Sequence, residues 1–120
     1  MKLFIKEFED ILNREINQNK PYWAVSLKEY NRTLFCAYCQ SKEREDQLID
    51  FNEVVWEHDV EEIMKNLRSL GVQEFTFSSS MTNNIEILAA FKKLNADIQD
   101  IVYVNNYKGA KIPAILLKIE

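Results

Sequence analysis

The sequence predicts an α+β fold, with a single mixed, mostly antiparallel sheet and about three helices. Three stretches repeat apolar residues at the spacing of an amphipathic helix, and six short runs rich in β-branched and aromatic residues have the composition of strands. Turn residues join two pairs of these runs as hairpins, which implies antiparallel pairing, whereas the strand–helix–strand connections between them allow parallel pairing. The expected order of elements is α-β-β-β-α-β-α-β-β.

The first third of the chain is expected to form a helix and a hairpin. Pro21 ends the helix, and residues 22–27 and 33–40 have strand composition. Asn31 lies in the turn between these runs, and asparagine tolerates a left-handed backbone. The helix is predicted from apolar residues that recur on one face, namely Phe4, Ile5, Phe8, Ile11, Leu12 and Ile16.

Cys36 and Cys39 fall in the second predicted strand. Positions three apart point to opposite faces of a sheet, so the two thiols cannot bind one metal from one face. His58 is the single histidine, and a closed zinc site would have to recruit carboxylates. We therefore expect no metal site and interpret the cysteines as small apolar residues.

The middle of the chain is expected to contain a third strand, residues 48–56, and a second helix. Asp59 and Glu62 have the spacing of an N-cap and its capping-box partner. Gly71 stands where a helix C-terminus needs a positive φ. The apolar stripe of this helix is Val60, Ile63, Met64, Leu67 and Leu70.

The last third is expected to form a strand, a helix and a hairpin. Residues 72–78 place Phe75 and Phe77 on one face of a strand. Residues 98–105 and 110–119 predict the hairpin, in which Pro113 should lie at an edge or a bulge because it has no N–H to donate. The helix before it would begin after Asn83 and bury Ile85, Leu88, Ala89 and Leu94.

The composition is that of one domain, residues 1–120, with 47% hydrophobic and 28% charged residues. A net charge of −4 makes nucleic acid an unlikely partner, because that role needs a surplus of cations. No apolar run approaches the length of a membrane span, and the N-terminus has no signal-peptide pattern. We expect a cytoplasmic protein without a membrane partner.

Residues 41–62 carry nine acidic and two basic side chains, a net charge of −7. A solvated loop and a helix start explain such a segment without a partner. Alternatively, residues 43–62 bind a basic partner protein, as an acidic inhibitor of a nucleic-acid-binding protein would.

Two groups of residues are candidate sites. A hydroxyl- and amide-rich turn before the third helix could hold a phosphate or carboxylate, although helix capping also selects such residues; it comprises Ser78, Ser79, Ser80, Thr82, Asn83 and Asn84. Glu53 and His58 form the second group, in which a carboxylate and an imidazole could supply a catalytic base.

After its first helix, the predicted order resembles the GNAT superfamily of acyl-CoA-dependent N-acyltransferases. The resemblance is sharpest in residues 84–96, where Asn84 and the Lys93-Leu94 pair keep the family's residues and spacing. Ile87 and Phe91 stand where the family often has alanine and tyrosine. The resemblance implies a GNAT-like fold with acetyl-CoA as cofactor. The chain also resembles uncharacterised small proteins of Gram-positive mobile elements.

Two departures from the family pattern bear on activity. Residues 54–62 are acidic and contain no glycine, where the family has a glycine-rich loop that binds pyrophosphate. Phe91 has no proton for a leaving thiolate. We therefore expect a non-catalytic GNAT-like binding or interaction protein without a cofactor. The alternative is an atypical N-acyltransferase with acetyl-CoA near Asn83 and Asn84. Residues 112–119 are a candidate hydrophobic edge for a homodimer through the C-terminal hairpin.

Overall fold

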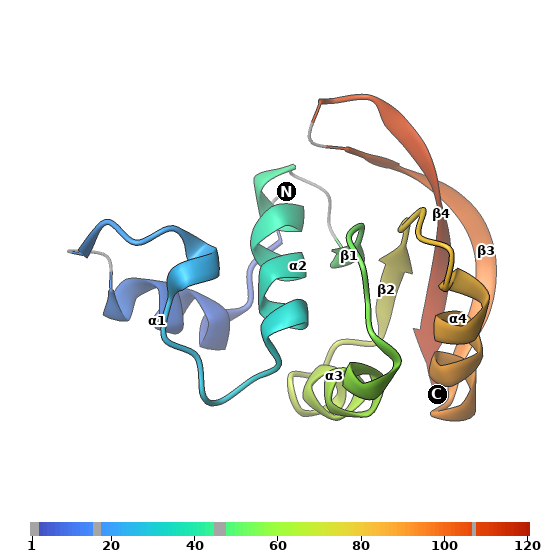
Figure 1. Ribbon diagram of the computed structural model, residues 1–120, viewed down its shortest axis with the longest axis horizontal. Coiled ribbons are helices and arrows are strands. Elements are labelled where there is room, and N and C mark those ends of the chain that lie inside the picture. Colours follow the sequence, from blue (N-terminus) through green and yellow to red (C-terminus); the bar gives the residue numbers. More distant parts are fainter. Residues whose placement is uncertain (1–2, 16–17, 45–47, 107) are drawn as a thin grey trace.

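The computed structural model describes residues 3–15, 18–44, 48–106 and 108–120, which form an α+β fold (Figure 1). One mixed sheet has four strands in the order β1-β2-β4-β3. β1 (Asp50–Phe51) is parallel to β2 (Glu74–Phe77), and β4 (Lys111–Ile119) is antiparallel to both β2 and β3 (Ala96–Asn105). The predicted fold class is confirmed, with four α-helices among the described residues in place of about three.

The last six elements follow the predicted order. α3 (Glu57–Ser69) connects β1 to β2, α4 (Asn84–Lys93) connects β2 to β3, and β3 and β4 form the C-terminal hairpin. The predicted strand at 48–56 is reduced to the two residues of β1. The parallel β1–β2 pair is therefore short, and both of its strands end close to the same edge of the sheet.

The predicted N-terminal hairpin is wrong. Residues 22–27 contain η2 (Tyr22–Ala24), a single turn of 3-10 helix, and residues 33–40 lie inside α2 (Arg32–Glu43). Asn31 is the N-cap of α2, with φ −63°, and its side-chain oxygen accepts a hydrogen bond from the Leu34 N–H at 3.1 Å. The N-cap and the burial of residues at helical spacing outweigh the strand composition here. The buried residues of α2 are Leu34, Phe35, Ala37, Tyr38, Cys39 and Ser41.

α1 (Lys6–Arg14) confirms the predicted first helix, although Ile16 lies outside the described residues. The Phe8 ring packs against α2, with centroid distances of 5.5 Å to Phe35 and 5.1 Å to Tyr38. The Tyr38 hydroxyl accepts a hydrogen bond from the Ile5 N–H at 3.1 Å and donates one to Glu9. Aromatic packing and these hydrogen bonds attach α1 to α2.

One face of the sheet carries the apolar core. Side chains alternate along a strand, so Phe51, Phe75 and Phe77 share a face. Phe91 of α4 is fully buried against them, with centroid distances of 6.1, 5.1 and 6.4 Å respectively. Phe91 is thus a core residue.

The opposite face of β1 and β2 carries polar side chains, and α2 packs beside β1. Asp50 and Thr76 are paired in register and point to this face. The Ser41 hydroxyl of α2 accepts a hydrogen bond from the Asp50 N–H at 2.8 Å and donates one to the Ala37 carbonyl at 2.7 Å. These contacts fix the last turns of α2 against β1.

α3 buries the predicted stripe, except that Leu70 is half-buried, and Gly71 has the predicted positive φ, +73°. Its N-terminus differs from the prediction, because Trp56 rather than Asp59 is the N-cap. Asp59 and Glu62 instead accept hydrogen bonds from Asn31 Nδ2, at 3.2 and 2.8 Å. The two acidic residues therefore join α3 to the start of α2 and do not form a capping box.

α4 starts where predicted but buries other residues. Ile85 is 81% exposed and Ala89 is also exposed, whereas Ile87 and Phe91 are buried. Leu88 and Leu94 are half-buried. The helix is rotated relative to the predicted face because Phe91 and Ile87, four positions apart, face the sheet.

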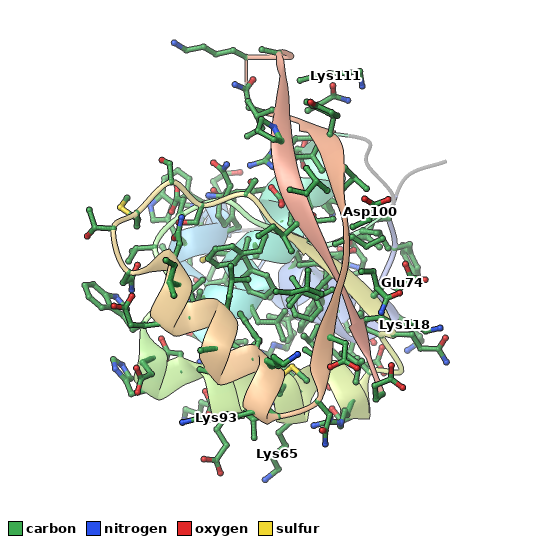
Figure 2. The ribbon with its side chains drawn as sticks, turned by 90° about the vertical axis from the view of Figure 1, so that its right-hand side faces the viewer. Lys65, Glu74, Lys93, Asp100, Lys111 and Lys118 are labelled. Carbon is green, nitrogen blue, oxygen red and sulfur yellow. The ribbon has the colours of Figure 1, made fainter. Side chains whose placement is uncertain are left out.

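The C-terminal hairpin runs along the outside of the molecule (Figure 2), with Asp100 on β3 and Lys111 near its tip. β4 lies between β2 and β3 from Ile115 to Lys118, so the prediction of residues 112–119 as an edge is wrong for that part of the strand, and the exposed edge strand is β3. Pro113 pairs with Tyr103 beyond Ile115, the last residue of β4 that pairs with β2. Its other side is unpaired, which confirms the expected local edge.

Among the residues described, no helix is both long and apolar enough to cross a membrane.

Candidate functional site

A buried polar network lies at the carboxyl ends of β1 and β2. The Asp50 side chain is fully buried and forms an ion pair with Arg44, whose side chain is 7% exposed, at 3.0 Å. Asp50 also accepts hydrogen bonds from the hydroxyls of Thr76 at 2.8 Å and Ser78 at 2.6 Å. Asn52 Nδ2 donates to Ser78 Oγ at 2.9 Å. The network links the end of α2 to both strands.

The burial of this carboxylate has a physical requirement. A charge removed from water is costly unless a counter-ion and hydrogen-bond donors replace the solvent. Arg44, Thr76 and Ser78 supply one positive charge and three donors to Asp50. The network is therefore a charge-paired polar cluster that connects the end of α2 with β1 and β2. We call Arg44, Asp50, Thr76 and Ser78 the polar floor.

A groove of about 640 Å³ lies beside this network and is lined by two of its members, Arg44 and Asn52. It lies between the C-terminal end of α2, the residues that follow β1 and the tip of the β3–β4 hairpin, which leans toward α2 in Figure 1. Its volume is within the range of small-molecule and short-peptide sites. The lining residues are Tyr22, Gln40, Glu43, Arg44, Asn52, Glu53, Asn105, Asn106 and Gly109.

Hydrogen bonds orient one wall of the groove. Gln40 Nε2 donates to the Tyr22 hydroxyl and to Glu53 Oε1, both at 3.1 Å. At the hairpin, Asn106 Oδ1 accepts from the backbone N–H groups of Lys108 and Ala110, at 2.9 and 3.0 Å. Side chains from three distant parts of the sequence thus hold fixed positions around one hollow.

The predicted hydroxyl- and amide-rich site is only partly assembled. Ser78, Ser79 and Asn84 line a separate hollow of about 160 Å³, together with apolar residues of α4, β3 and β4. Asn84 Nδ2 donates to the Ser79 carbonyl, and its buried Oδ1 has no partner among the described residues. Asn83 Nδ2 donates to the Val55 carbonyl at 3.0 Å. Ser80 and Thr82 are exposed.

Glu53 and His58 occupy different surroundings. Glu53 lines the groove and accepts a hydrogen bond from Gln40. His58 lies in the first turn of α3 with its side chain 79% exposed, and its Nε2 is 3.7 Å from Asp59 Oδ1. The structure therefore places Glu53 in the groove wall and His58 on the surface of a helix.

The cysteines are on α2, so the argument from opposite faces of a strand is wrong. Burial raises the pKa of Cys36, and it raises the pKa of Cys39 to about 12. Both are free thiols, and Cys39 is buried. Within the described ranges, no three His, Cys, Asp or Glu side chains gather as a metal site requires.

The acidic stretch is divided among several roles. Asp50 is in the buried network, and Asp59 and Glu62 bind Asn31. Glu43 and Glu53 line the groove. Residues 45 and 46 lie outside the described residues.

Residues 33–119 match the model of a family described as a domain of unknown function, DUF7698. The match covers most of the chain. The protein belongs to the DUF7698 family. No curated protein and no solved structure gave a significant match to the chain. The DUF7698 region begins in the first turn of α2 and ends with β4, so it contains the buried network and every residue of the groove except Tyr22.

Sequence reasoning missed the centre of this DUF7698 site. In the sequence, Arg44 and Asp50 are only members of the charged stretch, and Gln40 falls in a predicted strand. One signal was available, because Asp50 stands between Ile49 and Phe51 in a short apolar run. A charged residue in such a run must find a partner if the run is buried.

Proposed function

We propose that this DUF7698 protein is a small binding or interaction module of GNAT-like topology that uses the groove beside β1 and performs no acyl transfer. The observation that carries the proposal is the groove itself, with its buried Arg44–Asp50 floor. Ligands of open sheets with parallel strands bind in the crevice at the carboxyl ends of those strands. β1 and β2 are parallel, and Asn52 and Ser78 follow their carboxyl ends.

The GNAT-like part of the proposal draws on the order of elements. From β1 to β4 the chain runs β-α-β-α-β-β, which is the second part of the order that the resemblance implies. This part lies within the DUF7698 region. Because only the last six elements follow that order, the proposed GNAT-like topology concerns the part of the fold from β1 to β4.

Two observations favour binding without acyl transfer. The first turn of α3 carries Glu57 and Asp59, which would repel a pyrophosphate at the end of the helix where the family binds it. Phe91 is fully buried among phenylalanines, so it is part of the core. Neither position supplies the electrostatics or the proton that the family's reaction uses.

The alternative of an atypical N-acyltransferase makes a different prediction. It places acetyl-CoA near Asn83 and Asn84, with Glu53 or His58 as base. Asn83 Nδ2 donates a hydrogen bond to the Val55 carbonyl, whereas the buried Asn84 Oδ1 has no hydrogen-bond partner among the described residues. Ligand binding at the small hollow beside Asn84, rather than at the groove, would favour the alternative.

An NMR titration tests the proposal. Amide spectra of ¹⁵N-labelled protein are recorded with a library of neutral, cationic and anionic fragments, and separately with acetyl-CoA up to millimolar concentration. We expect saturable shifts at Gln40, Asn52 and Glu53 with members of the library and none with acetyl-CoA. Micromolar binding of acetyl-CoA, or a library without any ligand for the groove, would contradict the proposal. Resonances of Lys65 and Ser69 in α3, which line neither the groove nor the hollow beside Asn84, serve as internal references.

Two further predictions on partners remain. A homodimer through the C-terminal hairpin would use β3, the exposed edge strand, where Ile98, Ile101 and Tyr103 are 50%, 63% and 66% exposed. Light scattering at high protein concentration tests it, and a monomer would oppose it. Binding of a basic partner through residues 43–62 is developed next, because two exposed members of that segment line the groove.

A further inference from the structure

The charge of the groove is negative. Glu43 and Glu53 contribute two carboxylates, and the lining cation Arg44 is already neutralised by Asp50. The Lys111 ammonium donates to Asn105 Oδ1 at 3.3 Å beside the groove, so the two carboxylates outnumber it. An anionic ligand would meet both carboxylates, so electrostatics favour a cationic occupant.

The remaining lining groups are mostly amides. Gln40, Asn52, Asn105 and Asn106 come from α2, the residue after β1 and the hairpin. Side-chain amides carry a donor and an acceptor in the geometry of a peptide group. Within the described chain, no hydrogen bond reaches Gln40 Oε1 or Asn52 Oδ1, since only the amide nitrogens of these residues are used. Two carbonyl oxygens are thus available to backbone N–H groups of a ligand.

Glu53 has a similar arrangement. Its Oε1 accepts from Gln40 Nε2 at 3.1 Å, and no described residue donates to its second oxygen. The hydrogen bond from Gln40 limits the rotation of the carboxylate, so less conformational entropy is lost when the carboxylate binds a cation. The Tyr22 hydroxyl accepts a hydrogen bond from the same Gln40 amide. Its aromatic ring is a surface against which the alkyl part of a lysine or the guanidinium of an arginine can pack.

From this arrangement we infer that the groove is the docking site for an extended basic segment of a partner protein. Lysine or arginine side chains of that segment pair with Glu43 and Glu53, and its backbone hydrogen-bonds to the side-chain amides of Gln40 and Asn52. The inference rests on the proposed function, since it names the chemistry of what the groove binds. It also assigns the partner-binding role of the acidic segment to the two exposed carboxylates that the fold places in one hollow.

Fluorescence anisotropy with a labelled peptide tests the inference. The probe is tetramethylrhodamine-Gly-Ser-Arg-Lys-Ser-Gly-amide, whose dye has no net charge, and its neutral counterpart has citrulline and norleucine in place of arginine and lysine. We expect saturable binding of the basic probe, and at least tenfold weaker binding of the neutral one. The double variant Glu43→Gln/Glu53→Gln should weaken the basic probe by about tenfold, since two partly exposed charge pairs are lost.

The matched control is Glu57→Gln/Glu61→Gln, which removes the same charge from exposed positions of α3 outside the groove lining. We expect less than a twofold change from it. Equal weakening by both double variants would show general attraction to an acidic surface and would overturn the inference. So would neutral or anionic fragments that shift Gln40 and Asn52 while the basic peptide does not bind, although the proposed function would then stand. If neither fragments nor peptide bind at the groove, both fail. Unchanged circular dichroism of the variants verifies that they fold.

Discussion

The buried Arg44–Asp50 ion pair makes a strong prediction about stability. Asp50→Asn removes a charge that is fully buried and leaves the Arg44 guanidinium, 7% exposed, without its counter-ion. Breaking one partner of a buried ion pair costs about 3–5 kcal/mol, because the remaining charge is neither solvated nor paired. The hydroxyls of Thr76 and Ser78 also lose a charged acceptor, although these losses overlap with the first and do not add.

Urea unfolding followed by far-ultraviolet circular dichroism measures the effect. With a slope of about 2 kcal/mol per molar urea for a domain of this size, a loss of about 4 kcal/mol lowers the midpoint by about 2 M. Glu29→Gln is the control, since its ion pair with Arg14 is nearly half exposed, and its midpoint should hardly change.

A double-variant cycle separates the ion pair from other effects. Arg44→Met removes the cation, and the combination with Asp50→Asn removes the uncompensated charge as well. The double variant should therefore lose much less than the sum of the single variants, with a coupling of about 2 kcal/mol. A midpoint shift below about 0.5 M for Asp50→Asn, or additive single effects, would refute the description of this network as a dry, charge-paired floor.

Three further predictions concern the scaffold. Burial by itself would raise the pKa of Glu9, but hydrogen bonds from Lys42 and Tyr38 outweigh it and lower the pKa from its ordinary value of 4.5. Stability from this group is therefore present above pH 4.5 and lost as the pH falls through the lowered value, and thermal scans between pH 2 and 6 should show a shallower acid dependence for Glu9→Gln. Gly71→Ala should cost about 1 kcal/mol in urea unfolding, because φ is +73° and no atom lies near the added Cβ, and Gly71→Asn should cost less; a neutral Gly71→Ala would contradict the assigned backbone. Phe91→Ala should cost about 3–5 kcal/mol by the same measurement, and a loss below about 1 kcal/mol would show that Phe91 is not in the core.

The second part of the fold could be predicted because its signals agree. In α3, helical spacing, acidic residues in the first turn and Gly71 after the last turn all indicate the same helix. In the hairpin, two β-rich runs flank a turn that ends at Gly109, which has φ +79°. Local propensity, periodicity and turn chemistry reinforce each other in both elements.

The prediction of strands in residues 22–27 and 33–40 is wrong because the local signals there conflict. Residues 33–40 contain two aromatic residues and Thr33, yet they form a helix, since Leu34, Tyr38 and Ser41 bury one helical face and Asn31 caps it. The N-cap residue, Asn31, is one that turns also favour, and the sequence analysis places it in a turn. Composition is the weaker signal when a cap and a helical repeat both oppose it.

The groove could not be predicted as a site. Its lining comes from η2, α2, the residues after β1 and the hairpin, which only the tertiary fold brings together. Glu53 was identified, whereas Gln40 and Asn105 carry no local signal of a binding role. The neighbouring hydroxyl-rich turn carried such a signal and assembles only a small hollow at Ser78, Ser79 and Asn84.

The most direct test of the central claim is hydrogen–deuterium exchange of the intact chain with and without a saturating amount of the basic peptide. If the peptide binds in the groove, exchange should slow in peptides that cover residues 40–44, 52–53, 105–106 and 108–109, with residues 78–84 unchanged. Protection confined to residues 78–84, or no protection at all, would contradict the assignment of the groove as the binding site.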